Sequence, residues 1–227
     1  MISSPKRFFL ILTVFLLVLV TGSTFYSCDE APSASSVGAN NTKSLTNQSS
    51  EGTMTTFTET DQATEYVRIT MENGHTIVIR LLPQYVPITV TNFQELVSRH
   101  FYDGLIFHRV MSGFMIQGGD PKGNGTGGSD KTIKGEFIFE VNGQRTIIPH
   151  QRGVVSMARG KDPDSASSQF FICHADAPHL NGQYAAFGFV VQGMATVDEI
   201  AAVETDANDK PLVDQRMRTV RFVTPNK

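Results

Sequence analysis

The sequence predicts a mainly β domain with two helices, joined to an exported amino-terminal segment. From residue 66 onward, short runs of alternating or β-forming residues are separated by turns that contain glycine. Only two stretches have the three- and four-residue apolar spacing of an amphipathic helix. Many short strands with few helices are typical of a closed barrel or a sandwich, and the spacing of the strands does not decide between these two architectures.

The first two strands are predicted to form a hairpin. Residues 66–71 and 76–81 both alternate, and Asn73 and Gly74 lie between them. The Asn-Gly pair favours the positive φ angles of a tight hairpin turn. Further strands are predicted at residues 114–116, 137–139, 153–157, 169–172 and 186–190, and a last strand at 217–223 closes the sheet.

The longer helix is predicted at residues 90–101. Pro87 and Thr89 open this segment, and proline is favoured in the first turn of a helix. Apolar residues then recur at helical intervals, at Val90, Phe93, Leu96, Val97 and Phe101. Asp103 and Gly104 end the segment, and a second, shorter helix fits residues 197–202.

The segment 1–27 is predicted to be a signal peptide. Lys6 and Arg7 precede an apolar run at residues 8–20, and small and polar residues follow. The run is shorter than the roughly 20 residues that a membrane-spanning helix needs. Cys28 then follows Ser27, an arrangement that resembles the lipobox of bacterial lipoproteins. The resemblance implies cleavage before Cys28 and acylation of this cysteine.

The rest of the amino-terminal part sets the expected location of the protein. Phe25 and Tyr26 depart from the commonest lipobox, so an uncleaved anchor and plain secretion stay open as alternatives. Residues 28–63 are predicted to be a flexible tether, because small and polar residues dominate and the isolated apolar residues share no period. A flexible coil of about 35 residues reaches on the order of 30 Å. We therefore expect a periplasmic or cell-envelope protein whose folded domain, residues 64–227, is held at a bacterial membrane by a lipid on Cys28.

Charge and cysteine content argue against several functions. The net charge is -3, and Lys and Arg form no block beyond the first few residues, which argues against nucleic acid as a partner. Cys28 and Cys173 are the two cysteines, and their different settings argue against a disulfide between them. The histidines are not spaced as zinc ligands, so we expect neither a metal nor a cofactor.

Two further motifs are incomplete. Residues 123–128 satisfy G-x-G-x-x-G, but β-forming residues follow where a dinucleotide fingerprint needs a helix. Several serines, Ser156 and Ser165 among them, lie near His and Asp residues, but the G-x-S-x-G elbow of a serine hydrolase is absent from the sequence. Nucleotide binding and acyl transfer are therefore disfavoured.

A series of motifs in the second half of the chain resembles the cyclophilin family of peptidyl-prolyl cis/trans isomerases. The motifs are residues 107–110, 113–120, 125–128, 156–158, 168–172 and 187–188. No single motif decides the matter, but all of them follow the order of the family, from about residue 64 to the carboxyl end. The resemblance implies a closed eight-stranded antiparallel β-barrel capped by two α-helices, with a proline site on its outer surface.

The resemblance also assigns roles to single residues. Arg109 matches the catalytic arginine of the family, and Gln117 matches the residue that holds a substrate carbonyl. The positions that form the proline-ring pocket are Phe114, Met115, Phe171 and Leu180. The remaining substrate-binding positions are Gly125, Ala158, Arg159, Gln169, His179 and Tyr184.

Three of these positions depart from the best-known eukaryotic pattern. His179 stands where many members have Trp, Tyr184 where many have His, and Arg159 where many have Asn. That Trp donates a hydrogen bond to cyclosporin in sensitive members, so we expect His179 to weaken inhibition by cyclosporin. Arg159 could favour acidic residues beside the proline of a substrate.

The implied chemistry needs neither a nucleophile nor a metal. Rotation about a peptide bond faces a barrier of about 18–20 kcal/mol, because the nitrogen lone pair is delocalised into the carbonyl. The guanidinium of Arg109 stays protonated and can stabilise the twisted amide. We expect a monomeric isomerase that acts on proline-containing peptides and on unfolded or exported proteins. The alternative is a non-catalytic proline-binding or holdase module, which loss of the arginine would indicate, and Arg109 is present.

Overall fold

The structure is a computed structural model that describes residues 55–226. The predicted signal peptide, Cys28 and most of the predicted tether lie outside these residues. The strands are β1 (Phe57–Thr60), β2 (Tyr66–Met71), β3 (Thr76–Leu81), β4 (Ile106–Phe107), β5 (Arg109–Met111), β6 (Met115–Gly118), β7 (Phe139–Val141), β8 (Gln144–Thr146), β9 (Val154–Met157), β10 (Phe170–Cys173), β11 (Ala186–Gln192) and β12 (Gln215–Pro225). The helices are α1 (Pro87–Ser98), α2 (Met194–Ala201) and a single 3-10 turn, η1 (Pro178–Leu180). Within the described range, none of the helices has the length and apolar character needed to cross a membrane.

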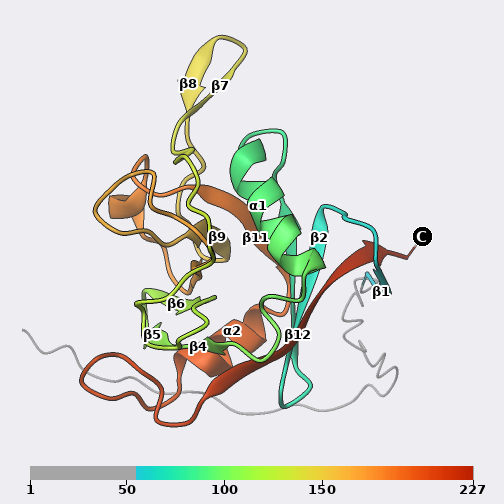
Figure 1. Cartoon of the computed structure of the whole chain (residues 1–227), viewed down its shortest axis with the longest axis vertical. Coiled ribbons are helices and arrows are strands. Elements are labelled where there is room, and N and C mark those ends of the chain that lie inside the picture. The colour runs from blue at the N-terminus through green and yellow to red at the C-terminus, as the bar shows by residue number, and fades with distance from the viewer. Residues whose placement is uncertain (1–54, 227) are drawn as a thin grey trace, which may run out of the picture. The chain divides into compact units, whose positions relative to one another are not determined.

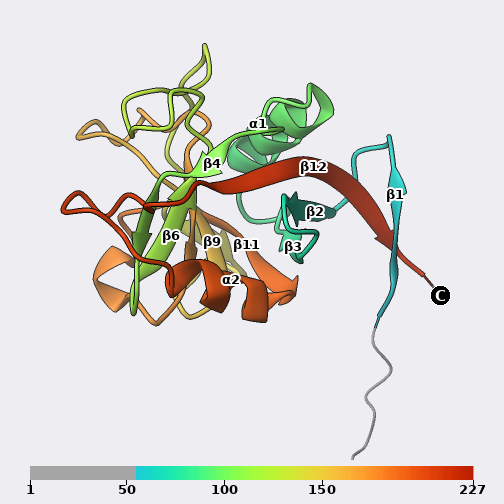
Figure 2. The ribbon, with the colours of Figure 1, turned by 90° about the horizontal axis from the view of Figure 1, so that it is seen from below.

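The strands form an antiparallel barrel (Figure 1). Pairing runs in the order β12-β2-β3-β11-β9-β10-β6-β5. Only His108 separates β4 from β5, and β5 pairs with β6 while β4 pairs with β12. With β4 and β5 counted as one interrupted strand, the hydrogen-bonded ring returns to its first strand. The eight-stranded barrel with two helices is therefore confirmed, and Figure 2 shows α1 and α2 on opposite sides of β12.

The predicted hairpin and both predicted helices are present. β2 and β3 pair antiparallel, and Gly74 takes a φ of +86° in the turn between them. α1 begins and ends three residues earlier than the predicted 90–101. Its end is earlier because His100 has a left-handed φ of 55°, which turns the chain before Phe101.

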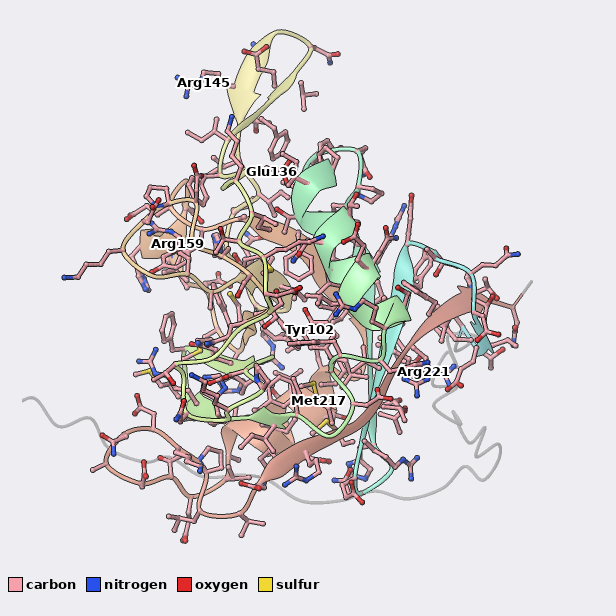
Figure 3. All side chains as sticks on the ribbon, viewed as in Figure 1. Tyr102, Glu136, Arg145, Arg159, Met217 and Arg221 are labelled. Atoms are coloured by element: carbon pink, nitrogen blue, oxygen red, sulfur yellow. The ribbon has the colours of Figure 1, made fainter. Side chains whose placement is uncertain are left out.

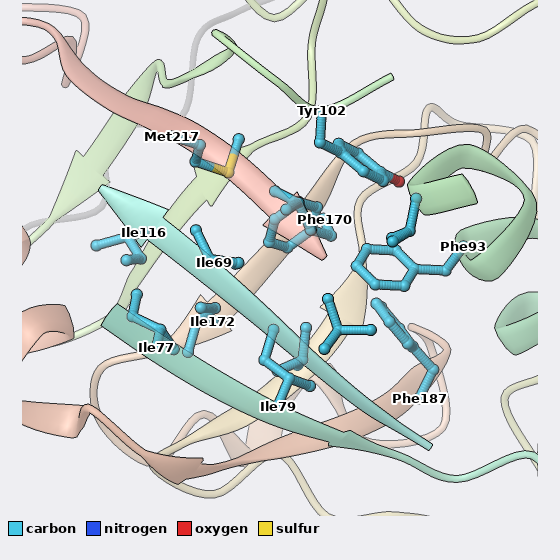
Figure 4. Close-up of a cluster of buried hydrophobic side chains, with 14 of the residues drawn as sticks. Ile69, Ile77, Ile79, Phe93, Tyr102, Ile116, Phe170, Ile172, Phe187 and Met217 are labelled. Atoms are coloured by element: carbon cyan, nitrogen blue, oxygen red, sulfur yellow. The ribbon is translucent and has the colours of Figure 1, made fainter. Parts of the chain in front are cut away.

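One hydrophobic cluster fills the barrel and reaches α1 (Figure 4). The ring centroid of Phe93 lies 5.0 Å from that of Phe187, 5.1 Å from that of Tyr102 and 5.7 Å from that of Phe170. The Tyr102 hydroxyl donates to the carbonyl oxygen of Ser168 at 3.1 Å, so this buried polar atom is satisfied. The aliphatic part of the cluster includes Ile69, Ile77, Ile79, Ile116, Ile172 and Met217. Because the interior is packed with side chains, a ligand has to bind on the outside of the barrel.

One strand lies in the segment that the sequence assigns to the tether. β1 pairs antiparallel with the carboxyl-terminal part of β12. The ring of Phe57 lies 5.6 Å from that of Tyr66, and the carbonyl of Phe57 accepts a hydrogen bond from Arg68 at 2.7 Å. The folded domain therefore includes residues from 57 onward, which corrects the predicted boundary at residue 64. The sequence gives little sign of β1, because Phe57 is its only apolar residue and backbone pairing with β12 holds it.

The predicted strand at residues 137–139 is also corrected. Only Phe139 belongs to a strand, β7, which pairs with β8 in a two-stranded sheet apart from the barrel, and Figure 1 shows this hairpin projecting outward. Phe137 instead packs against the core cluster. Asn142 and Gly143 both have positive φ in the connection, so an Asn-Gly turn makes this hairpin as it makes the first one.

A distant glutamate caps the amino terminus of α1. The N-cap residue Val86 has no side-chain acceptor. The carboxylate of Glu136 replaces it, and accepts the backbone N–H of Ile88 at 3.2 Å, the backbone N–H of Thr89 at 2.8 Å and the Thr89 hydroxyl at 2.7 Å. A negative charge at this end of a helix is also favoured by the helix dipole. Figure 3 shows Glu136 beside α1, so this contact joins the helix to the segment before β7.

Replacing Glu136 by alanine should lower the free energy of unfolding by about 1–2 kcal/mol, because buried donors of α1 lose their acceptor. Urea unfolding followed by circular dichroism measures the change. Glu140→Ala removes an exposed glutamate of β7 that makes no hydrogen bond to α1 and serves as the control. Equal stability of the two variants would contradict the capping role.

Candidate active site

A pocket opens outward from the barrel because side chains alternate along the strands beneath it. On β6 and β10, Ile116, Phe170 and Ile172 belong to the cluster that fills the barrel. Their neighbours Met115 and Phe171 therefore point to the opposite face, where they form a second buried cluster. The pocket above this second cluster has a volume of about 210 Å³.

Three of the predicted site residues lie in one row across the strands. Arg109 on β5 pairs with Gln117 on β6, and Gln117 pairs with Phe171 on β10. Neighbouring strands lie about 4.8 Å apart, so the row spans about 10 Å. Backbone pairing thus places a cationic residue, an amide residue and an aromatic residue next to one another.

Connecting segments supply the remaining walls of the pocket. Phe114 lies in the turn before β6, Leu180 ends η1, and Tyr184 precedes β11. The ring of Tyr184 meets that of Phe171 edge to face at 5.9 Å, and the ring of His179 lies 5.3 Å from that of Phe114. Leu180 and Phe171 are buried, so the floor of the pocket is apolar.

The structure brings together all the site residues that the resemblance assigns. Those that line the pocket are Arg109, Phe114, Met115, Gln117, Ala158, Arg159, Phe171, Leu180 and Tyr184. Gly125 and Gln169 line an adjoining groove that shares Gln117 with the pocket. The ring of His179 contacts that of Phe114, which lines the pocket. The role of each residue toward a substrate stays a prediction, as does the weak inhibition by cyclosporin.

Two contacts hold the guanidinium of Arg109. Its Nε–H donates to Oδ2 of Asp209 at 3.2 Å, and Nη2 donates to the sulfur of Met111 at 3.1 Å. An arginine has five N–H donors, so about three of them remain available to a ligand. The side chain is 42% exposed, and it is therefore open to a peptide that enters the pocket.

Gln169 and Asp120 fix the glycine-rich segment at residues 123–128. Gln169 accepts a hydrogen bond from Gln117 at 2.8 Å and donates to the carbonyls of Gly125 and Gly127. The carboxylate of Asp120 accepts the backbone N–H of Gly125 and of other loop residues. Burial alone would raise the pKa of Asp120, but these backbone donors hold it below its usual value. The G-x-G-x-x-G segment is thus a wall of the groove, and Asp120 is a structural residue of the site to which the motif reading gave no role.

Arg159 supports the wall that carries Tyr184. Its guanidinium lies 4.9 Å from the ring centroid of Tyr184 and 5.5 Å from that of Phe137. Nε donates to the carbonyl of Gln183 at 3.0 Å, and Nη1 donates to that of Gly160 at 2.9 Å. Figure 3 shows Arg159 among the loops, and it lines the pocket. The guanidinium thus lies over the rings of Tyr184 and Phe137, two contacts that the sequence did not predict.

A buried histidine lies beneath the floor of the pocket. The ring of His150 stacks on Phe171 at 6.0 Å, and its Nε2 lies 2.9 Å from the Ser156 hydroxyl. Oδ1 of Asn181 accepts the backbone N–H of His150 and faces its Nδ1 at 3.2 Å, so Nδ1 carries the proton and Nε2 accepts from Ser156. Burial lowers the pKa of His150, which keeps the ring neutral. The sequence carries no sign of this contact between His150 and the pocket floor.

A reactive thiol and a cluster of metal ligands are two further kinds of group that could carry out chemistry. Burial raises the pKa of Cys173 to about 12, so its thiol stays protonated near neutral pH and is a poor nucleophile. In residues 55–226, no three His, Cys, Asp or Glu side chains cluster in a way that could hold a metal ion. The pocket itself is lined by hydrogen-bond donors, Arg109 and Gln117, and by an apolar surface.

Known proteins are similar to this chain in sequence and in fold. The family described as cyclophilin type peptidyl-prolyl cis-trans isomerase/CLD matches residues 66–222. Peptidyl-prolyl cis-trans isomerase B of Bacillus subtilis is 48% identical over 125 residues, which cover 55% of this chain and 82% of that protein. A peptidyl-prolyl cis-trans isomerase of Arabidopsis thaliana is 44% identical over 136 residues, which cover 60% of this chain and 82% of that protein.

A solved structure gives the same result. A cyclophilin type peptidyl-prolyl cis-trans isomerase of Cryptosporidium parvum, determined in the presence of the dipeptide Ala-Pro, has a TM-score of 0.62 and 31% sequence identity, over 69% of this chain and 98% of that one. Fold and pocket define a β-barrel protein with a small apolar site beside an arginine on its outer face. The chain belongs to the cyclophilin-type peptidyl-prolyl cis-trans isomerase family.

Stability should fall as the pH drops below about 6.5, because burial holds the pKa values of His150 and His108 below that of an unfolded histidine. The unfolded chain then binds protons that the folded chain excludes. This stabilisation is complete above about pH 6.5 and is lost as the pH falls toward the folded pKa values. Urea unfolding from about pH 8 to about pH 5 measures the slope, which His150→Gln should reduce. A slope that His150→Gln leaves unchanged would contradict this account.

Proposed function

We propose that the domain accelerates rotation about X-Pro peptide bonds by non-covalent stabilisation of the twisted amide, with Arg109 as the catalytic residue. The row across the strands carries this proposal, because it sets Arg109 and Gln117 beside the apolar floor formed by Phe171. The relative from Cryptosporidium parvum was determined in the presence of Ala-Pro, which supports proline-containing peptides as ligands of this chain.

Binding would begin with the proline ring. The ring has no N–H to satisfy, so it gains by burial against the side chains of Met115, Phe171 and Leu180. Nε2 of Gln117 has two hydrogens and donates one of them to Gln169, so the other can donate to a substrate carbonyl. These contacts would fix one side of the X-Pro bond while the other side turns.

Rotation breaks the conjugation of the amide and returns the lone pair to the proline nitrogen. The free N–H groups of Arg109 can then donate to that nitrogen or to the carbonyl of the proline. Because Asp209 and Met111 hold the guanidinium before a peptide arrives, the donor needs little reorganisation when the amide twists. No bond to the enzyme forms, and no proton is transferred.

The alternative is a module that grips proline segments without catalysis. The apolar floor would serve both functions equally, so the discriminating feature is a donor within reach of the amide. Arg109 lines the pocket and keeps free donors there, which favours the isomerase.

Replacing Arg109 by alanine should reduce kcat/KM by about 100-fold or more, which is the scale of losing a preorganised donor. A protease-coupled assay of a short X-Pro peptide with the full chain in detergent measures the rate. Arg99→Ala removes an exposed arginine that is paired with Asp130 at 4.0 Å and should leave the rate unchanged. If wild type and Arg109→Ala both run near the uncatalysed rate, the binding module is the better description.

We infer that the domain works outside the cytoplasm on a lipid anchor at Cys28, with exported proteins as its clients. The support is the order of basic residues, apolar run and cysteine at the amino terminus. The tether would join the domain at β1, and Figures 1 and 2 show β1 on the opposite side of the domain from β6, which carries part of the pocket. An anchored domain would therefore keep its pocket accessible.

Replacing Cys28 by serine should abolish incorporation of labelled fatty acid and move the protein out of the membrane fraction, because buried acyl chains supply about 0.8 kcal/mol per CH₂. Labelling and fractionation of cells that express the full chain measure both effects. Cys173→Ala removes the other cysteine and should change neither. Unchanged membrane partitioning of Cys28→Ser would refute the anchor and leave the isomerase proposal intact.

A further inference from the structure

The segment between α2 and β12 forms a hydrogen-bonded turn that contacts Arg109 of the pocket. Thr205 and Pro211 form an isolated β-bridge across it. The Asp206 carboxylate accepts the backbone N–H of Asn208 at 2.8 Å and that of Lys210 at 3.0 Å. These contacts enclose Asp209 and restrict its backbone.

Asp209 contacts β5 in two independent ways. Its carbonyl oxygen accepts the backbone N–H of Val110 at 2.8 Å, which docks the turn on the strand. Its carboxylate Oδ2 accepts Nε–H of Arg109 at 3.2 Å. Asp209 itself has a φ of 62°, a left-handed conformation that aspartate and asparagine tolerate better than most residues. The turn therefore presents this carboxylate to the arginine in a defined geometry.

We propose that Asp209 is a positioning residue for catalysis, which holds the guanidinium of Arg109 in the orientation that the twisted amide requires. The inference rests on the proposed role of Arg109. A guanidinium is planar, so the hydrogen bond of Nε with Asp209 and the contact of Nη2 with Met111 together restrain the orientation of this plane. Both Nη groups keep N–H donors for the substrate.

The Arg109 side chain needs the contact with Asp209 because it is exposed to solvent. The side chains of Arg109 and Asp209 are 42% and 37% exposed, so a free arginine here would sample many rotamers in water. Catalysis by a preorganised donor requires that these rotamers be restricted before the substrate binds. An ion pair exposed to this degree contributes modestly to stability, and its effect on catalysis should be separable from its effect on folding.

The chain offers a matched control in the same segment. Asp214 forms an ion pair with Arg216 at 2.7 Å, and neither residue lines the pocket. Asp209→Gly removes the carboxylate while keeping a residue that accepts positive φ without strain. Asp209→Asn keeps a side-chain oxygen that can accept Nε–H, and asparagine also tolerates this φ.

The test measures kcat and KM separately for the full chain by exchange NMR on a short Ala-Pro peptide. Asp209→Gly should lower kcat by about 3- to 5-fold with KM within about 2-fold, the scale of one exposed charged hydrogen bond. Asp209→Asn should stay within about 2-fold of wild type in both constants, and Asp214→Asn should match wild type. The Nε–H resonance of Arg109 should be protected from exchange in wild type and Asp209→Asn and lost in Asp209→Gly.

The outcomes separate this inference from the proposed function. A wild-type kcat for Asp209→Gly, together with a large loss for Arg109→Ala, would overturn the positioning role alone. Equal losses of kcat and of thermal stability in Asp209→Gly and Asp209→Asn would also overturn it, because the turn would then matter only for folding. Equal activity of wild type and Arg109→Ala would overturn the proposed function and the inference with it.

Discussion

The structure depends on the two-residue alternation of side chains along β6 and β10. Each strand fills the barrel with one set of side chains and builds the pocket with the other. On β10, Phe170 packs against Phe93 in the core, while Phe171 forms the floor of the pocket. A slip of one residue in the pairing would exchange these two faces, so the packing of the core and the geometry of the site are specified together.

A contact at the ends of these strands helps to hold their register. Gly119 follows β6 with a φ of +82°, and a side chain there would collide with the carbonyl oxygen of Ser168. The Ser168 hydroxyl donates to the carbonyl of Gly119 at 2.7 Å, and the Ser168 carbonyl accepts a hydrogen bond from the Tyr102 hydroxyl at 3.1 Å. The backbones of the two pocket strands and the aromatic core thus meet at one point. These contacts give Gly119 and Ser168 a structural role in their motifs, although neither residue lines the pocket.

The sequence predicts what local patterns determine. Asn73 and Gly74 located a hairpin, helical spacing located α1, and the family resemblance located every residue that lines the pocket. Asn142 and Gly143 also form an Asn-Gly pair with positive φ angles, but no hairpin was predicted at this pair. Long-range contacts leave no local pattern, so neither the capping of α1 by Glu136 nor the contact of Asp209 with Arg109 could be predicted. β1 was missed for the same reason, because its stability comes from a strand at the other end of the chain.

Strands and connecting segments contribute differently to the site. Arg109, Gln117 and Phe171 lie on paired strands, where backbone hydrogen bonds determine their spacing. The residues that support the side chains of the site lie on segments between strands. Asp209 contacts the guanidinium of Arg109, and Arg159 stacks on the ring of Tyr184. Substitutions in such segments leave the barrel pairing intact, so they can change the orientation of a donor or the width of a wall without endangering the fold. Differences in rate and specificity between proteins of this fold should therefore arise first in these connecting segments, while the row across the strands stays constant.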